Sequence, residues 1–502
     1  MPRARLSPAG VRGLGRGVLA CAALALLGAC ATQEYFRDAG NAPASPAIPL
    51  ERWPHPEVWT GVVFNGEKVG FTRRAVRAAT DAPGRFEIES EAAIRLRFLG
   101  IDKRLALRSL DRVRADLTLE SFRYSHEIDG SSLEVEGTSD RKVLEFSVRN
   151  SSGVEQHSVP LDKPLYPSSV LTMLPAAKGL AVGDTASYAV FNGETQSVAE
   201  AEQEVQAWQS SEFFAGLAFR VLTRLHGLET LTWISPDGRP LFERGLNGVM
   251  ISALEDEARA RRYLVEASLS RQDALVDFSL LRAGPIKDPR RVSRLEIALE
   301  DVPPGFAVPQ GGGQRCSRAG RRLDCIVDRA APPARDDPAR YLKATLAAPS
   351  NLGEIKVLAS RISQGEKDPD KVIASLLAWI DANIAKEAID GFSAVDVLRE
   401  RRAECQGHSY LLAAFARALA IPARIVNGIV YSEAHGGFLY HTWNELWIEG
   451  SGWRPVDATF AQAHADATHL RLLEGETAAE LLPLATLVGR IRVASVSAVG
   501  RW

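Results

Sequence analysis

Cysteine and methionine are scarce in this chain, with five and three residues among 502, and neither sign of charge dominates. The formal net charge is −2, and the absence of a basic patch or acidic tail argues against a nucleic-acid or charge-driven partner. No histidine or cysteine cluster has metal-ligand spacing, and the glycine run at 311–313 lacks the lysine and helix of a phosphate loop. We therefore expect neither a metal nor a cofactor. The length predicts two or three domains, and 46% hydrophobic residues suffice for packed cores.

The first thirty residues predict export. Four arginines precede an apolar stretch at 18–27, which is shorter than the about 20 residues that span a bilayer and is typical of a signal peptide over 1–29. The stretch ends in Leu-Gly-Ala-Cys, which resembles the bacterial lipobox and would make Cys30 a lipidated first residue. The alternative is an ordinary signal peptide that is cleaved nearby.

Lipid chains on Cys30 would hold the protein at a membrane surface without a spanning helix. Ala31 follows where an aspartate would favour retention at the inner membrane, so we expect the outer membrane, with the protein facing the periplasm. Residues 30–50 are rich in alanine and proline and lack a period, which predicts a flexible tether. No later segment is long and apolar enough to cross a bilayer.

The remaining cysteines separate into a pair and a single residue. Cys316 and Cys325 flank a short polar segment that reads as a hairpin tip, and an oxidising periplasm would favour a disulfide between them. The alternative is two unpaired surface thiols. Cys21 lies in the signal and Cys30 is the lipid acceptor, so Cys405 has no partner. An odd cysteine in an exported protein indicates a reactive thiol.

Residues 51–300 follow mainly a period of two and predict a β domain. Apolar runs at 58–64 and 67–72 flank an Asn-Gly pair, which is a strong hairpin signal. We expect one large twisted antiparallel sheet or incomplete barrel, or two β units, with a helical candidate at 199–208. Residues 292–301 are either the last strand of this region or the first strand of a small β piece that carries the cysteine pair.

The period becomes helical after the cysteine-pair hairpin and linker at 301–339. Residues 352–363 and 368–387 predict helices, and 340–475 as a whole predicts a mixed domain of helices followed by strands. Residues 476–502 are expected to form a C-terminal tail. The fold class is therefore α+β, with a mainly antiparallel β domain first.

A thiol, an imidazole and a carboxylate each stand at the edge of a regular element in this last domain. Cys405 opens the helical run at 404–426, His441 heads the alternating strand HTWNELWIE, and Asp457 lies in the returning strand WRPVDATF. These are the parts of a cysteine nucleophile with its base and orienter. Neighbouring residues on paired strands have Cβ atoms about 4.5–5.5 Å apart, so a hydrogen bond from His441 to Asp457 is feasible.

The start of the Cys405 helix also supplies hydrogen-bond donors. A helix N-terminus presents unpaired N–H groups and a partial positive charge, which stabilise a thiolate and the oxyanion of a tetrahedral intermediate. The backbone N–H of Cys405 is the first candidate donor. Gln406 and the indole of Trp379 are candidates for the second donor.

Three motifs carry a resemblance to a known family. They are ECQGHSYLLAAFARALAIPARIV around Cys405, YHTWNELWI around His441 and WRPVDATF around Asp457. Residues 340–475 resemble the transglutaminase-like core of the papain-like cysteine protease superfamily. The resemblance implies a papain-like α+β fold in which Cys405, His441 and Asp457 form the catalytic triad.

Two classes of function remain open at this point. The resemblance implies an acyl-transfer enzyme that forms a thioester and acts as a protease, an amidase or an amide cross-linker, because the family includes all of these. Its substrates would be envelope proteins or peptides. The alternative is a lipid-anchored, non-catalytic module that binds peptides or assists assembly through the same fold. The oligomeric state is not predicted.

Overall fold

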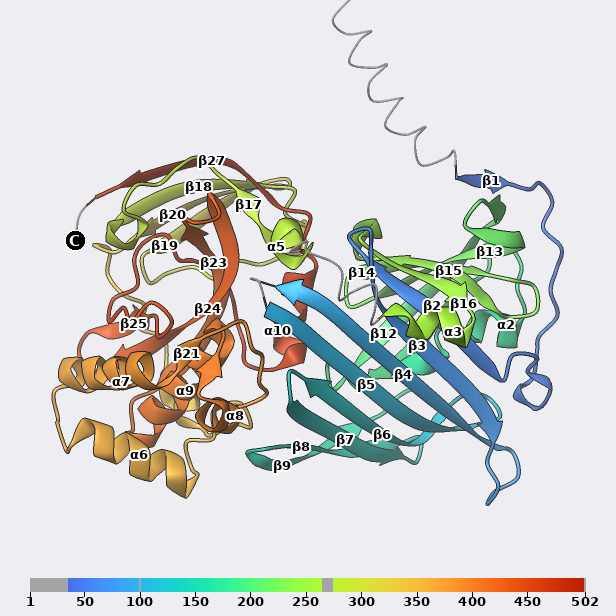
Figure 1. Ribbon diagram of the computed structural model, residues 1–502, viewed down its shortest axis with the longest axis horizontal. Helices are drawn as coiled ribbons and strands as arrows, with labels where there is room; N and C mark the ends of the chain where they lie inside the picture. The colour runs from blue at the N-terminus through green and yellow to red at the C-terminus, as the bar shows by residue number, and fades with distance from the viewer. Residues whose placement is uncertain (1–34, 99–100, 264–273, 501–502) are drawn as a thin grey trace, which may run out of the picture.

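The computed structural model describes residues 35–98, 101–263 and 274–500, which form two lobes (Figure 1). One lobe is a large sheet from the N-terminal half, and the other combines helices with smaller sheets. The chain is mostly β and agrees with the predicted α+β class. The predicted signal peptide and Cys30 lie outside the described residues.

Within the described residues, sixteen strands form the N-terminal sheet in the order β10-β11-β12-β13-β14-β15-β16-β2-β3-β4-β5-β6-β7-β8-β9, with β1 added beside β12. They are β1 (Phe36–Asp38), β2 (Glu57–Phe64), β3 (Glu67–Ala78), β4 (Arg85–Phe98), β5 (Ile101–Arg114), β6 (Leu119–Ile128), β7 (Ser131–Ser139), β8 (Val143–Asn150), β9 (Gly153–Pro160), β10 (Leu165–Pro167), β11 (Thr185–Asn192), β12 (Ser197–Ser211), β13 (Phe214–Leu225), β14 (Leu228–Ile234), β15 (Pro240–Gly245) and β16 (Met250–Glu255). Most neighbours are antiparallel, while β10 and β11 are parallel. This is one large sheet, the first of the arrangements left open by the sequence.

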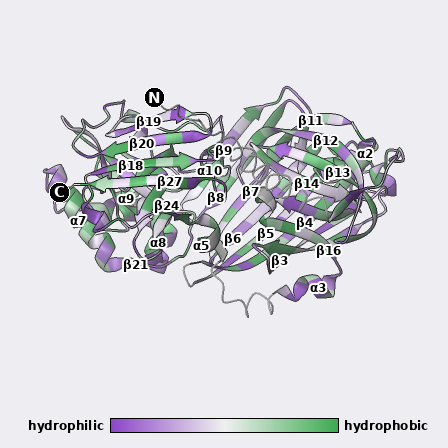
Figure 2. Cartoon of the chain, turned by 90° about the horizontal axis from the view of Figure 1, so that it is seen from above, coloured by the Kyte–Doolittle hydropathy of each residue, from purple (hydrophilic) through white to green (hydrophobic). Residues whose placement is uncertain are grey.

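The predicted helix at 199–208 is wrong, because this segment lies inside strand β12. Glutamate, alanine and glutamine favour helices, but they alternate here, so that Ala201 and Val205 are buried on one face. Strands β11 and β13 pair with β12 on both sides. Hydrophobic and hydrophilic residues likewise alternate along several strands of this lobe (Figure 2).

The predicted flexible tether also differs from the structure over its described part. Strand β1 pairs with β12, and Ser45 bridges Leu180. Leu50 is buried in the core between the sheet and the short helix α2 (Leu174–Lys178). Residues 35–50 therefore lie along the β lobe. The strand hydrogen bonds of β1 and the buried side chain of Leu50 hold this segment, although its sequence has no helix or strand periodicity.

The second lobe contains two small sheets. One is built from β17 (Leu281–Arg282), β23 (Ala423–Ser432), β24 (Gly437–Ile448), β25 (Gly452–Val456) and β26 (Leu470–Glu474), and the other from β18 (Arg294–Glu300), β19 (Gln314–Ala319), β20 (Arg322–Asp328) and β27 (Arg492–Val499). A two-stranded piece pairs β21 (Ala385–Lys386) with β22 (Arg402–Ala403).

The boundary between the lobes lies earlier than the predicted residue 300. Strand β18 pairs with β20 and β27, so it belongs to the small β piece that carries the cysteine pair. The expected C-terminal tail at 476–502 contains helix α10 (Ala478–Ala485) and strand β27. It is an integral part of the lobe because β27 completes a sheet whose other strands come from residues 294–328.

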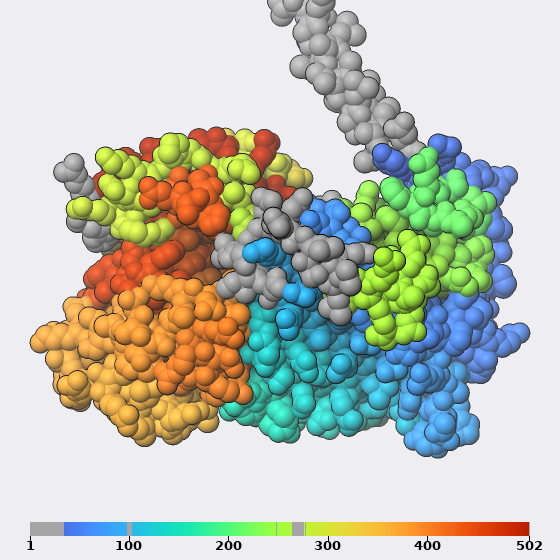
Figure 3. Space-filling model, in the orientation of Figure 1, coloured from blue at the N-terminus to red at the C-terminus, as the bar shows by residue number. Residues whose placement is uncertain are grey.

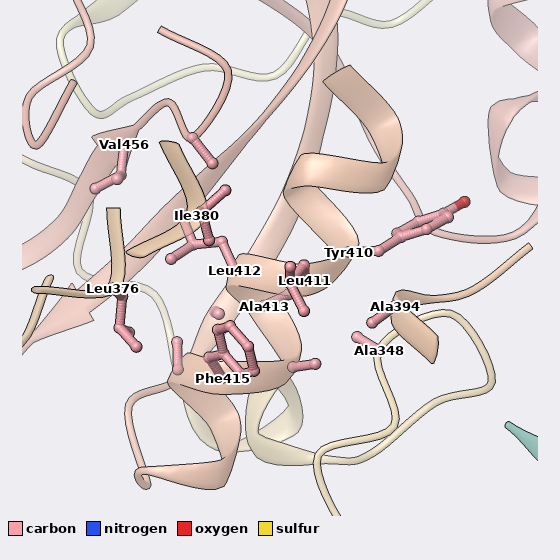
Figure 4. Close-up of a cluster of buried hydrophobic side chains, with 14 of the residues drawn as sticks. Ala348, Leu376, Ile380, Ala394, Tyr410, Leu411, Leu412, Ala413, Phe415 and Val456 are labelled. Atoms are coloured by element: carbon pink, nitrogen blue, oxygen red, sulfur yellow. The ribbon is translucent and has the colours of Figure 1, made fainter. Parts of the chain in front are cut away.

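The helices of the second lobe surround α9 (Cys405–Ala418). They are α6 (Gly353–Ser363), α7 (Pro369–Asn383) and α8 (Ala394–Glu400). Two short helices, α3 (Glu257–Arg261) and α5 (Ala274–Ser279), come earlier in the chain, before β17. Leu411, Leu412 and Phe415 of α9 are fully buried beside Leu376 and Ile380 of α7 (Figure 4). Burial of each such side chain stabilises the fold by about 1.5–3 kcal/mol, which gives the N-terminus of α9 a rigid support.

The two lobes touch along the helical part of the second lobe, where it lies against the strands around β7–β9 (Figure 3). Asn150 at the end of β8 donates to the backbone oxygens of Leu346 and Phe392, at 3.3 and 3.4 Å. Among the described residues, no helix is long and apolar enough to span a membrane.

Candidate active site

Helix α9 begins at Cys405, so the thiol stands where the first backbone N–H groups have no intrahelical acceptor. Two hydrogen bonds fix this helix to strand β24. Ser409 Oγ donates to the backbone oxygen of Thr442 at 3.1 Å, and Asn444 Nδ2 donates to the backbone oxygen of Ser409 at 3.0 Å. Because His441 is the neighbour of Thr442, these bonds set the position of the thiol relative to the imidazole.

The imidazole and the carboxylate meet as the sequence predicts. Strands β24 and β25 pair as far as Asn444 and Val456, and Asp457 follows directly. His441 Nε2 lies 2.7 Å from Asp457 Oδ2, and both side chains are buried. The side chain of Cys405, which is partly exposed, forms a hydrogen bond with His441. Since Nε2 faces the carboxylate, Nδ1 is the ring nitrogen left for the thiol.

Charge decides the protonation of this pair. Burial by itself lowers the pKa of His441, but the Asp457 carboxylate and Cys405 outweigh it and raise that pKa to about 9. Burial raises the pKa of Asp457, yet His441 and His469 outweigh it and hold that pKa well below its usual range. At neutral pH the base is therefore an imidazolium beside an ionised carboxylate, the state that pairs with a thiolate.

A second buried histidine, which the sequence analysis missed, shares the same carboxylate. His469 Nε2 lies 2.9 Å from Asp457 Oδ2, and its Nδ1 lies 3.1 Å from the backbone oxygen of Asp466. Both ring nitrogens thus face acceptors, which only the doubly protonated ring satisfies. Burial lowers the pKa of His469, but Asp466 and Asp457 outweigh it and raise the pKa.

The chain of charges continues outward from His469. Asp466 Oδ2 accepts from Arg290 Nη1 at 2.9 Å, and the Arg290 guanidinium lies 4.2 Å from the ring centroid of Phe460. The Phe460 ring stacks on His441, with ring centroids 5.1 Å apart. Phe460 and Asp457 therefore hold the catalytic imidazole from its face and from its edge.

The predicted oxyanion donors separate in the structure. The backbone N–H of Cys405 stays at the helix start, as expected. The side chain of Gln406 borders the same cavity but donates to Tyr410 Oη. Trp379 packs against Phe415, with ring centroids 5.6 Å apart, so the helical core holds this indole away from the thiol.

His408 lies on the helix that begins at Cys405. Its side chain is buried one turn after Cys405. His408 Nδ1 lies 2.8 Å from the backbone oxygen of Glu404, and burial lowers the pKa of the ring. A neutral imidazole held by its own helix turn is a packing group, so His441 remains the base.

The cluster of His441, Asp457 and His469 offers three potential metal ligands within 4.8 Å of one another. Each imidazole Nε2, however, lies at hydrogen-bond distance from one carboxylate oxygen, at 2.7 and 2.9 Å. A metal ion bound there would replace the Nε2 protons of His441 and His469, and His441 could then no longer act as a base. The cluster is therefore best described as two imidazolium donors on one carboxylate.

The β lobe brings Lys103, which also pairs with Asp129 of the same lobe at 3.3 Å, to the surroundings of Cys405. Lys103 Nζ of β5 lies 2.7 Å from Asp390 Oδ2 and 3.8 Å from Glu404 Oε2, beside the nucleophile. Burial and Asp390 raise the pKa of Glu404 well above its usual range, although Lys103 opposes this. The cation thus reduces the acidic charge that would otherwise face a thiolate.

The predicted cysteine pair forms a disulfide in the structure. Cys316 of β19 and Cys325 of β20 lie directly opposite each other in register, and their sulfur atoms are 2.04 Å apart. The bridge lies in the small sheet with β18 and β27. It leaves Cys405 as the free cysteine of the described residues.

Cys405 and His441 open into a cavity of about 1310 Å³ between the two lobes. Its walls come from strands β2–β6 and β16 on one side, and from α10, β23 and β24 on the other. Both Cys405 and His441 are among its lining residues. A molecule in this cavity can therefore contact the thiol and both lobes.

Comparisons with known proteins agree with this site. Residues 356–458 match the transglutaminase-like superfamily, so the chain contains a transglutaminase-like domain, and this confirms the resemblance seen in the sequence. The matched range includes Cys405, His441 and Asp457. No curated protein matches the chain.

Three solved structures share parts of the fold. A candidate cysteine protease from Cytophaga hutchinsonii is 17% identical over 41% of this chain and 86% of its own, with a TM-score of 0.28. The periplasmic domain of TgpA from Pseudomonas aeruginosa is 19% identical over 36% of this chain and 75% of its own, with a TM-score of 0.27. A beta-barrel-like protein of a domain of unknown function from Brucella abortus is 10% identical over 40% and 95%, with a TM-score of 0.31. All three likenesses are weak and partial.

Proposed function

We propose that the transglutaminase-like domain is a cysteine acyl-transfer enzyme that acts on carboxamide or peptide bonds through a thioester. The observation that carries the proposal is the buried contact of His441 with Asp457, at 2.7 Å, on the ring whose other edge meets the Cys405 thiol. A module that only binds peptides has no need for a poised base beside a thiol at a helix start.

The proposed reaction begins with the thiolate of Cys405. Its sulfur attacks the carbonyl carbon of the substrate, and the oxygen becomes an oxyanion that the N–H of Cys405 is placed to receive. The imidazolium of His441 then gives its proton to the departing nitrogen, so ammonia or an amine leaves and a thioester remains. Asp457 keeps the ring oriented throughout and stabilises its charged form.

The second half returns the enzyme to its starting state. Water or an amine attacks the thioester carbon, and neutral His441 accepts the proton of the nucleophile. The collapse of the intermediate expels the Cys405 thiolate and restores the ion pair. Water as acceptor makes the protein a protease or amidase, and an amine makes it a cross-linker.

We also propose that the protein works in the cell envelope, held at the outer membrane by lipid chains on Cys30. Support comes from the apolar stretch and lipobox-like end of the first thirty residues. Cys30→Ser should move the protein from the membrane fraction to the soluble fraction. A variant that stays with the membrane would disprove the anchor.

Alkylation of Cys405 tests the enzymatic proposal. Iodoacetamide should label the thiol rapidly at neutral pH, and His441→Ala should slow labelling by roughly 10- to 100-fold, because the base that ionises it is gone. The matched control is His435→Ala, which removes a histidine of the same cavity whose Nδ1 bonds to Ser432 Oγ at 2.8 Å. Equal labelling of wild type and His441→Ala would contradict the proposal.

Trapping an acyl group on Cys405 would identify the substrate. Envelope extract should yield an acyl group on Cys405 that mass spectrometry detects after rapid acid quenching, while Cys405→Ala should carry none. Persistent failure to trap an acyl-enzyme, together with slow alkylation, would instead favour the peptide-binding alternative.

A further inference from the structure

A continuous apolar belt lines the β-lobe wall of the cavity that contains Cys405. The strand registers place its members side by side across the sheet, because Met250 pairs with Phe64, and Leu105 pairs with both Ile94 and Ile128. Val69 joins the belt between β2 and β4. Paired residues on one face of a sheet have adjacent side chains, so the belt crosses six strands without a charged member.

The opposite wall is apolar as well. Leu481 and Leu484 of α10 line it, together with Val488 and with Val430 and Leu439 of the central strands. The cavity of about 1310 Å³ exceeds the roughly 300–1,000 Å³ of ordinary small-molecule sites. Apolar surface of this extent stays unfavourably hydrated until an apolar group covers it.

Charged residues line the cavity as well, and a cluster of them lies beside the nucleophile. Lys103 stands two residues from Leu105 on β5, and therefore on the same face, and it reaches Asp390 and Glu404 beside Cys405. One strand thus joins the apolar belt to the catalytic end. A ligand that fits must be apolar over most of its length and polar near the thiol.

We infer that the substrate carries a long aliphatic chain, which lies along the belt while its scissile carbonyl reaches Cys405. This inference rests on the proposed function and names its substrate class, an amide or peptide that bears an acyl chain. Every wall strand from β2 to β5 is paired on both sides, so the wall has no free backbone groups for a peptide. A bare peptide amide buried there would lose its hydrogen bonds to water without replacement, whereas an alkyl chain has no such groups to satisfy.

Alkylating reagents of graded length test this substrate class on the full chain. Iodoacetamide and its N-butyl, N-octyl and N-dodecyl derivatives are compared below their aggregation concentrations, with glutathione as the reference thiol. Since each buried CH₂ adds favourable apolar contact, we expect the labelling rate to rise roughly tenfold or more from iodoacetamide to the octyl reagent. Glutathione should show no such rise.

Two variants locate the effect. Leu105→Trp fills the belt and should abolish the dependence of the labelling rate on chain length. The control Leu110→Trp alters a residue of the same strand that is 40% exposed and outside the cavity, and should keep the dependence. The wild-type series is decisive even if Leu105→Trp misfolds.

The outcomes separate this inference from the function on which it rests. Fast labelling by iodoacetamide with no gain from longer chains would overturn the aliphatic substrate and leave the triad intact. Slow labelling by every reagent would overturn the enzyme itself. A gain that survives in Leu105→Trp would place the chain elsewhere and also refute the belt.

Discussion

Asp457→Asn offers the sharpest test of how the site is charged. The Oδ1 atom of Asp457 accepts from the backbone N–H groups of Thr459 and Phe460, at 2.7 and 3.0 Å. An asparagine can keep these two bonds only if its oxygen takes that side. Its NH₂ group must then point toward His441. His441 can accept a hydrogen bond from this group only if its Nε2 carries no proton.

The substitution therefore changes the tautomer as well as the charge. A neutral His441 with bare Nε2 carries its proton on Nδ1, toward the thiol, and cannot accept another one there. Its pKa of about 9, against 6.5 for an ordinary imidazole, corresponds to roughly 3 kcal/mol of preference for the charged ring. Most of that preference goes with the carboxylate, so the ion pair should become on the order of 100-fold rarer at neutral pH.

The assay is the rate of iodoacetamide labelling from pH 5.5 to 9.5, followed by intact mass. Asp457→Asn should be slower by on the order of 100-fold near pH 7 and should approach the wild-type rate at high pH, where hydroxide ionises the thiol. The matched control Asp370→Asn removes an exposed carboxylate that pairs with Arg454. Wild-type rates and profile in Asp457→Asn would refute the reasoning.

Four further outcomes are expected. His469→Gln keeps a donor to Asp457 but removes a neighbouring cation, so the alkaline limb of the labelling profile should move up by roughly half to one pH unit. Glu445→Gln removes the carboxylate that the buried Arg424 and Arg471 share, and should lower the free energy of unfolding in urea by about 3–5 kcal/mol. Lys103→Met leaves the carboxylates at the junction of the lobes without this cation. The free energy of unfolding should fall by about 2–4 kcal/mol, which is measured as a lower unfolding midpoint. The raised pKa of His441 contributes stability that is fully present below about pH 6.5 and is lost as the pH rises to about 9. The free energy of unfolding should therefore fall by up to roughly 3 kcal/mol between these two pH values. His441→Gln should not show this fall.

The grouping of Cys405, His441 and Asp457 could be predicted from the sequence because each residue lies in or beside an element with a strong local pattern. Cys405 precedes an apolar helical stripe, and His441 and Asp457 belong to a hairpin that closes over a short turn. Local periodicity and a short connection therefore determine most of the geometry. The remaining contact, from thiol to imidazole, follows once α9 packs against β24.

His469 could not be found in the same way. It stands directly before β26, and β26 reaches the site only by pairing with β23, which comes more than 35 residues earlier. One local signal existed, since His469 stands directly before the apolar strand β26. The pairing of β18 with β27 and of β2 with β16 likewise joins segments about 190 residues apart, beyond the reach of any local pattern.

The two lobes are linked by charge as well as by packing. Without the β lobe, Asp390 and Glu404 would stand beside the nucleophile without Lys103, and their negative charge would disfavour both the thiolate and the oxyanion. The apolar residues of α10 would also lose the wall they face across the cavity. The β lobe therefore supplies a lysine and one wall to the cavity into which Cys405 and His441 open.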